Sequence, residues 1–368
     1  MTRRFVCKVI SAIAVCLGPM VPLHVMAAEP PAPPEVSSEE VDKAVDLAIA
    51  YLKSQQKEDG HINDVGSNDT AMTALALMAL ASVGNQPADH MPAGEVMQKA
   101  LKFVLADERQ ESNGYFGQRD GSRMYGHGIT TLMLSEMLGM GIDDEQDQRI
   151  RSRVQKAVDL ILRAQQVKKS PREAGGWRYN PDSHDSDLSV SVWQLMSLRS
   201  AKNAGIDVPA SAIQEAVDYL KRSNTRDGNN RARVEDISKS GFSYQPGSRD
   251  ATYTMTSAGL LAMQVCGQYE ATEVKEAAQW LADRKLDFKE RFFFYGTYYY
   301  AQGMYQRGGQ LASKARTNVE SLLLARQRPD GSWQSEDGQE RGAGGVYSTS
   351  LAILSLSVKD HFLPIYQR

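Results

Sequence analysis

The sequence predicts an all-α fold, a closed α/α toroid of six outer and six inner helices. The first observation is a repeat, because one unit of two helices joined by a glycine-containing turn recurs six times along nearly the whole chain. The second is periodicity, since apolar residues recur at spacings of three and four and no segment shows sustained alternation. The third is that the second helix of each unit is apolar on most faces, which is typical of a helix inside a domain.

The first helix of each unit is amphipathic and is expected on the outside of the ring, with one apolar stripe facing inward. Ser38 is a good N-cap residue for the first of them. The outer helices centre on Ala44–Leu47, Ala100–Phe103, Ala157–Leu160, Ala216–Leu220, Ala277–Leu281 and Val319–Leu323.

The second helix of each unit is rich in small and apolar residues and is expected on the inside. The inner helices centre on Thr73–Leu80, Thr131–Leu138, Ser191–Leu198, Thr256–Met263, Tyr300–Tyr305 and Thr349–Leu356. An open solenoid needs polar repeats at its two ends. The last repeat ends in Leu351–Val358, which is as apolar as any internal one, and this indicates a closed ring.

The turns between the two helices of a unit share a Gln, a Gly and an aromatic residue. The clearest is Gln327, followed after three residues by Gly331 and after one more by Trp333. This spacing fits a helix ended by a glycine in the left-handed region, with the Gln bonding free backbone groups and the aromatic ring folding back on the helix end. We therefore expect a structural clamp in which Trp333 is buried.

The repeated turn resembles the prenyltransferase and squalene-oxidase repeat of terpenoid cyclases and protein prenyltransferases. Further stretches resemble exported bacterial members of that family; they are Trp193–Pro209, Gly241–Gly247, Tyr295–Tyr299 and Leu363–Arg368. The resemblance covers nearly the whole chain after its first residues and implies the α/α toroid. It leaves the activity open, because one toroid hosts unrelated chemistries.

Residues 1–28 read as a secretory signal peptide. Arg3 and Arg4 supply a charged start, Val9–Leu17 an apolar stretch and Val25–Ala27 a small-residue cleavage site. The mature protein is then exported to the periplasm or the extracellular space, without a transmembrane helix. If the segment is retained instead, it serves as an anchor.

Residues 29–38 form a proline-rich linker and residues 39–368 the toroid domain. The formal charge of −3 and the absence of a basic stripe argue against a nucleic-acid partner. Cys266 is the only cysteine outside the signal, so neither an intrachain disulfide nor a thiolate zinc cluster is expected. The histidines show no metal-ligand spacing, and no metal or other cofactor is expected.

Two acidic residues before an inner helix are the candidate catalytic groups, Asp185 and Asp187. One interpretation makes Asp187 the N-cap of that helix, with a lowered pKa, so that Asp187→Asn is tolerated and Asp187→Ala costs about 1 kcal/mol. The other follows from the family resemblance. Squalene-hopene-type cyclases carry an Asp-x-Asp-Asp motif whose middle carboxyl protonates an alkene. Asp187 would take that place and Asp185 that of the first carboxylate, while Leu188 replaces the third.

Six further residues are candidates for the lining of a ligand cavity. Registering the inner helices on a shared Thr or Ser places Asp69 and His127 level with Asp187, at helix starts. The segment 292–300 is aromatic on nearly every face, more than one buried stripe needs. The candidates are Asp69, His127, Tyr295, Tyr298, Tyr299 and Tyr347.

Three functions remain open from the sequence, and it does not decide whether the protein is an enzyme. The favoured one is an exported toroid that binds a small hydrophobic, glycan or protein ligand. The second is a terpenoid cyclase or isomerase using Asp187, against which size argues, because those cyclases close their cavity between two α-domains and this chain has helices for one. The third is a carbohydrate-active enzyme with paired carboxylates. The shape of the ring's centre is the observation that would separate them.

Overall fold

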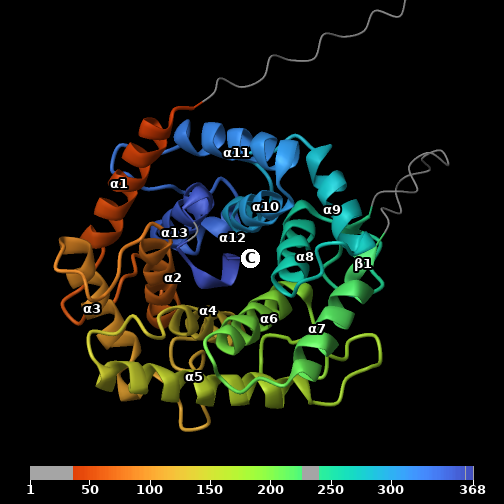
Figure 1. Ribbon diagram of the computed structural model, residues 1–368, viewed down its shortest axis with the longest axis horizontal. Coiled ribbons are helices and arrows are strands. Elements are labelled where there is room, and N and C mark those ends of the chain that lie inside the picture. The colour runs from red at the N-terminus through yellow and green to blue at the C-terminus, as the bar shows by residue number, and fades with distance from the viewer. Residues whose placement is uncertain (1–35, 226–239, 361, 368) are drawn as a thin grey trace, which may run out of the picture. The chain divides into compact units, whose positions relative to one another are not determined.

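The computed structural model describes residues 36–225, 240–360 and 362–367 (Figure 1). The expected signal peptide and most of the proline-rich linker lie outside the described residues. The part from Pro34 to Arg368 forms one compact unit, and the description below concerns this unit alone.

Within this unit, outer helices surround inner helices, as Figure 1 shows. The outer helices are α1 (Ser38–Ser54), α3 (Pro92–Val104), α5 (Asp144–Gln165), α7 (Ala210–Ser223), α9 (Thr272–Ala282) and α11 (Gly309–Leu324). The inner helices are α2 (Asp69–Ser82), α4 (Arg123–Glu136), α6 (Leu188–Asn203), α8 (Tyr253–Val265), α10 (Phe293–Arg307) and α13 (Gly344–Leu356). The fold class expected from the sequence is confirmed.

The remaining elements are short. They are α12 (Gly338–Arg341), the 3-10 turns η1 (Asp107–Arg109), η3 (Ser357–Lys359) and η4 (Pro364–Tyr366), and the strands β1 (Asn224–Thr225) and β2 (Gly241–Phe242), which pair antiparallel. In the part of the chain that the structure describes, no helix is both long and apolar enough to cross a membrane.

The ring closes through contacts between its first and last repeats. Helix α13 packs against α2, and α1 contacts both α11 and α13. The side-chain Nε2 of Gln327 donates to the carbonyl oxygen of Ala44 in α1 at 2.7 Å. Lys359 reaches Asp42 of α1 at 2.9 Å. Closure therefore rests on specific bonds as well as on apolar packing.

The expected clamp is present in four repeats, and it also joins neighbouring outer helices. In each, the Gln Nε2 donates to the carbonyl oxygen of its own turn glycine and to a carbonyl oxygen of the next outer helix. The bonds run from Gln56 to Gly60 and Val96, from Gln110 to Gly114 and Arg153, from Gln165 to Gly175 and Ala212, and from Gln327 to Gly331 and Ala44. One side chain thus ends a helix and ties it to its neighbour.

The aromatic residue of the clamp is buried beneath the turn. The indole Nε1 of Trp333 donates to the carbonyl oxygen of Leu323 at 2.8 Å, and its backbone N–H donates to Oγ1 of Thr349 in the inner helix at 3.1 Å. Trp177 makes the same pair of bonds, to Ile161 and to Ser191. The turn therefore fastens an outer helix to the inner helix that follows it.

Aromatic rings and the end of the chain fill the centre of the ring. Trp193 of α6 stacks on Tyr298 of α10 with ring centroids 5.9 Å apart. The turn η4 lies against α6, the hydroxyl of its Tyr366 bonds that of Tyr298, and the N–H of Ile365 donates to Oε2 of Glu136 at 3.0 Å. Burial raises the pKa of Glu136 to about 7.

Candidate functional site

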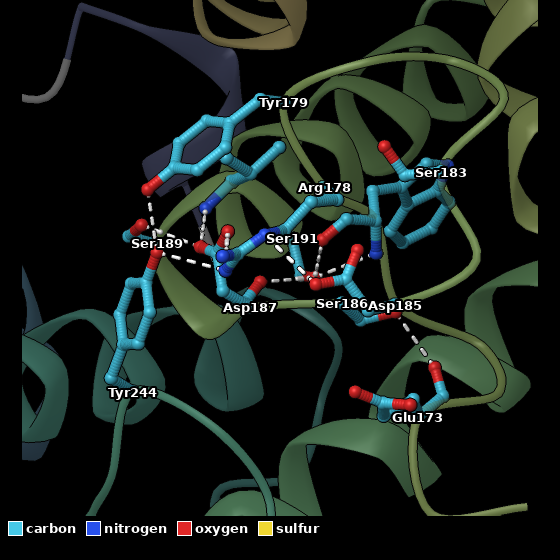
Figure 2. A network of polar contacts seen from close by, with 12 residues as sticks. Glu173, Arg178, Tyr179, Ser183, Asp185, Ser186, Asp187, Ser189, Ser191 and Tyr244 are labelled. Atoms are coloured by element: carbon cyan, nitrogen blue, oxygen red, sulfur yellow. Dashed lines mark hydrogen bonds and ion pairs between the residues drawn. The ribbon is translucent and has the colours of Figure 1, made fainter. Parts of the chain in front are cut away.

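The candidate site lies where helix α6 begins, and we call it the Arg178 cluster. It consists of Arg178, Tyr179, Asp185, Asp187, Ser189 and Tyr244 (Figure 2). The first three stand in the loop between α5 and α6, the next two at the start of α6, and Tyr244 in the loop after β2. The loop returns on itself because the N–H of Asp187 donates to the carbonyl oxygen of Trp177 at 2.9 Å, next to the clamp.

Asp187 is the N-cap of α6, as the capping interpretation expected. Its Oδ1 accepts from the N–H of Val190 at 2.9 Å and from Oγ of Ser189 at 2.6 Å. Its Oδ2 accepts from Nη1 of Arg178 at 2.9 Å. The residue is 0% exposed, so both oxygens are occupied by protein groups and neither meets solvent.

The pKa of Asp187 is shifted in the direction opposite to the one expected from the sequence. Burial raises the pKa of this carboxyl above its ordinary value, and the bonds from Ser189, from the N–H of Val190 and from Arg178 offset that rise only in part. The cap geometry alone favours the charged form, but removing the carboxylate from water outweighs it. The expectation of a lowered pKa was therefore wrong.

Arg178 connects the buried cap to the surface of the cluster. Its Nε lies 3.2 Å from Oδ2 of Asp185, whose side chain is 45% exposed, and its Nη1 also donates to the hydroxyl of Tyr244 at 2.9 Å. The guanidinium lies over the rings of Tyr179 and Tyr244, 4.7 and 5.5 Å from their centroids. Nothing in the sequence spacing joins Arg178 to Tyr244, which is 66 positions away.

The tyrosines proposed to line a cavity divide into two groups. Tyr298 and Tyr299 are 0% exposed and pack on each other and on Trp193, so they fill the centre and do not line an opening. Tyr295 is also buried, and its hydroxyl donates to the carbonyl oxygen of Ser189 at 3.1 Å, beside the cluster. Tyr347 of α13 is only partly buried. The expectation of a cavity lining is therefore wrong for Tyr298 and Tyr299.

His127 was also placed at a helix start and in the cavity, and both placements are wrong. It is the fifth residue of α4 and 0% exposed. Its Nδ1 accepts from the N–H of Phe116 at 3.3 Å and its Nε2 lies 3.2 Å from the carbonyl oxygen of Ala157. His127 therefore occupies the position at which Thr349 accepts the clamp N–H in the last repeat. The register expected from the sequence pairs Thr349 with Thr131, which lies four residues later in α4.

Asp69 is the first residue of α2 and does not cap it. Its Oδ1 accepts from Nδ2 of Asn63 at 2.9 Å, whereas the N–H of Ala71 donates to Oδ2 of Asp120 at 3.1 Å. The clamp bonds from Ile62 to Thr73 and from Trp177 to Ser191 put Asp69 and Asp187 at the same register position, as expected, but only Asp187 caps its helix. The residue preceding Asp69, Asn68, occupies the N-cap position and makes no side-chain cap bond.

Asp120 belongs to a set of carboxylates that the sequence pattern did not reveal. Each stands in the segment before one inner helix and accepts at least one backbone N–H from the start of the preceding inner helix around the ring. Asp64 serves α13, Asp120 serves α2 and Glu340 serves α10. Because these pairs are up to 282 positions apart, only the closed ring brings them together.

Two buried titratable groups give a testable dependence of stability on pH. Burial lowers the pKa of His127 to about 3, so the unfolded chain binds a proton below about pH 6.5 that the folded chain does not, and acid destabilises. The pKa of Glu136 is raised to about 7, so between about pH 7 and 4.5 the folded chain keeps a proton that the unfolded chain has released. At Glu136, lowering the pH across this range therefore stabilises the folded chain. Each contributes up to about 1.4 kcal/mol per pH unit.

We therefore expect Glu136→Gln to lose more stability than the wild type between pH 7 and pH 5, and His127→Gln to lose less. Urea unfolding of the three proteins at both pH values measures this. The comparison between variants cancels the contribution of the exposed carboxylates, which all three share. Equal pH dependence in all three would show that neither group titrates between these limits.

The occupied oxygens of Asp187 also predict a graded response to substitution. Asp187→Asn keeps an acceptor for the N–H of Val190 and loses the ion pair with Arg178, which retains Asp185, so we expect a loss of about 1 kcal/mol. Asp187→Ala loses both and is expected to cost about 2 kcal/mol. Urea unfolding compares them with Asp185→Asn, whose side chain is half-exposed and whose effect should be small. A loss from Asp185→Asn as large as that from Asp187→Ala would contradict this account.

The described residues contain no group of three or more His, Cys, Asp or Glu side chains that could hold a metal ion. Cys266 is partly buried, and the burial raises the pKa of its thiol to about 12. The Arg178 cluster itself offers one guanidinium, two carboxylates, two tyrosine hydroxyls and the hydroxyl of Ser189.

Comparison with known proteins identifies the fold. Residues 35–171 and 165–293 match the sequence model of the prenyltransferase alpha-alpha toroid domain. No curated protein matches the chain significantly in sequence.

Among solved structures, the type II terpene cyclase MstE from Scytonema is 15% identical, with a TM-score of 0.59, over 90% of this chain and 100% of its own. Cellobiose 2-epimerase from Bacillus thermoamylovorans is 12% identical, with a TM-score of 0.62, over 88% of this chain and 100% of its own. The alpha-1,6-mannanase GH76A from Salegentibacter is 9% identical, with a TM-score of 0.56, over 88% and 99%. At such identities the likeness shows the fold alone.

The Scytonema structure corrects one expectation. Size was held to argue against a cyclase, because a cyclase cavity was expected to need two α-domains. A type II terpene cyclase is matched here over 100% of its length by 90% of this chain, so a chain of this size is not too short for that class of enzyme.

Proposed function

The chain belongs to the prenyltransferase alpha-alpha toroid domain family, and within that family we propose that it acts as an exported ligand-binding domain and not as a cyclase. Export rests on the signal-like features of residues 1–28. The binding role rests on the state of Asp187 and on the filled centre of the ring.

The observation that carries the proposal is the occupancy of Asp187. A carboxyl group that protonates an alkene must point its O–H into an apolar cavity next to the substrate. Here one oxygen accepts two bonds from the start of α6, and the other accepts from Arg178 at 2.9 Å. A positively charged guanidinium at that distance stabilises the carboxylate and opposes the protonated form that donates a proton.

The centre of the ring supports the same proposal. A cyclase needs a cavity in which a long isoprenoid folds, yet Trp193, Tyr298 and Tyr299 contact one another there, and Tyr366 from the end of the chain packs on Tyr298. What remains accessible at the Arg178 cluster is a rim of partly exposed groups, Arg178, Tyr179, Asp185 and Tyr244, which is suited to contact a ligand from outside.

A terpenoid cyclase using Asp187 is the second candidate, and one observation favours it. Burial raises the pKa of Asp187, which is what a general acid requires. The likeness to the Scytonema cyclase is compatible with this reading, as the likenesses to the epimerase and the mannanase are with a carbohydrate-active enzyme. The ion pair with Arg178 is the reason that we rank the binding role above the cyclase.

Turnover assays test the proposal. The purified chain is incubated with squalene, with geranylgeranyl substrates and with cello- and manno-oligosaccharides, and the products are analysed by mass spectrometry and chromatography beside an active cyclase and an active mannanase. We expect no conversion. Cyclised product from the wild type and none from Asp187→Asn would establish the cyclase, and hydrolysed or epimerised sugar would establish the carbohydrate-active enzyme.

Export is tested separately in a bacterial host. We expect the mature protein outside the cytoplasm, with an N-terminal sequence that begins near residue 29. Full-length protein that stays in the cytoplasm would reject the signal-peptide interpretation without affecting the binding role.

A further inference from the structure

The segment 363–367 lies among the inner helices and is held there by a small set of separate contacts. The side chains of Leu363, Ile365 and Tyr366 are buried, and the turn η4 that they form packs on α6. Phe362, directly before the segment, is exposed. The buried part is therefore a short peptide that occupies a site between α4, α6 and α10.

Two hydrogen bonds fix the position of the segment in this site. The backbone N–H of Ile365 donates to Oε2 of Glu136, the last residue of α4, at 3.0 Å. The hydroxyl of Tyr366 bonds the hydroxyl of Tyr298 in α10, and the two rings meet edge to face with centroids 6.5 Å apart. In peptide recognition, main-chain bonds give affinity and side-chain contacts give specificity, and this site makes one bond of each kind.

The backbone conformation of the segment is stabilised within the segment itself. The N–H of Tyr366 donates to the carbonyl oxygen of Leu363, and the N–H of Gln367 donates to that of Pro364, both at 3.1 Å. The proline fixes its own φ and so reduces the entropy lost when the segment is ordered. A separate peptide with the same sequence pattern can therefore adopt the same turn.

The ring buries a carboxyl group at the point where it meets the backbone of the segment. Glu136 is 2% exposed and bonds Oγ of Ser200 as well as the N–H of Ile365. Burial raises the pKa of this carboxyl to about 7, which shows that its charged form is disfavoured there. An apolar residue would cost less to bury but would leave the N–H of Ile365 unpaired. Glu136 thus serves the backbone of the segment.

The described contacts that close the ring and those of the Arg178 cluster do not involve this segment. Closure rests on contacts of α1 with α11 and α13, and on the bond from Gln327 to Ala44. The cluster lies at the start of α6, where Ser189 stands, whereas Ser200 contacts Glu136 eleven residues later. Eleven residues of α-helix span about 16 Å, so the two sites are separate.

We propose that the site between α4, α6 and α10 is a peptide-binding site that the chain's own segment 363–367 occupies and thereby closes. A protein partner takes the site by presenting a segment of the same chemistry, with an apolar residue, a proline, an apolar residue and a tyrosine in that order. A hydrocarbon ligand could fill the apolar part of the site but could not replace the bonds to Glu136 and Tyr298. The inference deepens the proposed function and rests on it, since it names the ligand of the binding domain.

Hydrogen exchange of the full mature chain tests whether the segment leaves its site while the ring stays folded. We expect the protection factors of the amides of residues 365–367 to be about a hundredfold lower than those in the middle of α6, or lower still, because the segment opens locally. Equal protection in the two regions would show that the segment is released only by global unfolding, and it would overturn the proposal. This measurement uses the wild type and does not depend on the stability of a variant.

Fluorescence anisotropy with a labelled peptide of the sequence of residues 363–368 tests the site on the same chain. Tyr366→Ala weakens the chain's own segment, which competes with the peptide, so this variant should bind the peptide about tenfold more tightly than the wild type does. A peptide with alanine in place of its tyrosine should bind the variant about tenfold more weakly. Phe362→Ala is the matched control, because that side chain is 51% exposed, and should bind as the wild type does.

A further substitution locates the bound peptide. Tyr298→Phe, introduced into the Tyr366→Ala chain, removes the hydroxyl that the tyrosine of the peptide bonds, and it should weaken peptide binding about fivefold, the effect of one hydrogen bond between uncharged groups. Tyr253→Phe in the same chain is the matched control and should change nothing, because its hydroxyl bonds that of Thr297. Melting temperatures show whether each variant is folded.

Three outcomes contradict the peptide site. They are no peptide binding by a folded Tyr366→Ala chain, binding that is insensitive to the tyrosine of the peptide and to Tyr298→Phe, and loss of protection of residues 365–367 on addition of geranylgeraniol but not of peptide, which would identify a lipid ligand instead. Conversion of substrate in the turnover assays would reject the binding role itself. Failure of the peptide site and failure of the proposed function are therefore distinguishable.

Discussion

Replacing Trp333 by alanine is expected to lower the free energy of unfolding by about 3–5 kcal/mol, the range for truncating a large buried aromatic residue. The side chain is 0% exposed. Its loss leaves a cavity beneath the turn and removes the hydrogen bond that the indole donates to the carbonyl oxygen of Leu323 at 2.8 Å. Because this turn belongs to the repeat that meets α1, the loss weakens the closure of the ring as well as the local packing.

Urea unfolding followed by circular dichroism measures the effect. Phe362→Ala provides the control, because that aromatic ring is 51% exposed and its truncation should change stability little. A similar small change for Trp333→Ala would mean that the clamp contributes no stability and that the packing of the turn is misjudged.

The second large effect is expected at Gly331, which has a positive φ of 84°. A Cβ atom there would lie 2.3 Å from the carbonyl oxygen of Leu47 in α1, and backbone cannot move aside as the end of a flexible side chain can. Gly331→Ala therefore combines the strain of the left-handed region, about 1–2 kcal/mol, with a steric clash across the closure of the ring. We expect a total loss of about 3 kcal/mol or more, above the typical effect of a point substitution.

Gly267→Ala separates the two contributions. Its φ is 80°, yet nothing lies within 4 Å of the position of its Cβ, so it should show the strain alone. Thermal and urea unfolding of the two variants give the difference, which is the cost of the clash. Equal losses would mean that the last turn does not press against α1.

The repeat and its periodicity were sufficient to predict the fold because both are local properties. The spacing of apolar residues identifies a helix and its buried stripe within a single segment, as at Ala44–Leu47, and an all-round apolar helix such as Thr73–Leu80 has to be inside. The clamp was predictable for the same reason, since Gln327, Gly331 and Trp333 lie within one turn. Asp187 as a cap also follows from its position directly before a helix.

The register of the inner helices was less predictable, and His127 shows why. A Thr or Ser recurs at several positions of each inner helix. In the sequence, pairing Thr131 with the Thr or Ser of the other inner helices therefore fits as well as pairing His127 with them. In the structure His127 holds this position, because its Nδ1 accepts the N–H of Phe116 as Oγ1 of Thr349 accepts the N–H of Trp333. An imidazole nitrogen accepts the hydrogen bond that a hydroxyl oxygen accepts in the last repeat. Residue similarity does not suggest that a His and a Thr are equivalent.

The sequence by itself thus determined the helices, the ring and the local turns, whereas only the tertiary structure decided the candidate sites. The pairs of Arg178 with Tyr244 and of Asp64 with the start of α13 join residues 66 and 281 positions apart. The contact between Tyr366 and Tyr298 likewise depends on the end of the chain returning to α10. Helix periodicity depends on neighbours a few residues away, but hydrogen bonds between loops depend on how the closed ring orients each loop toward the next, and no local pattern records that orientation.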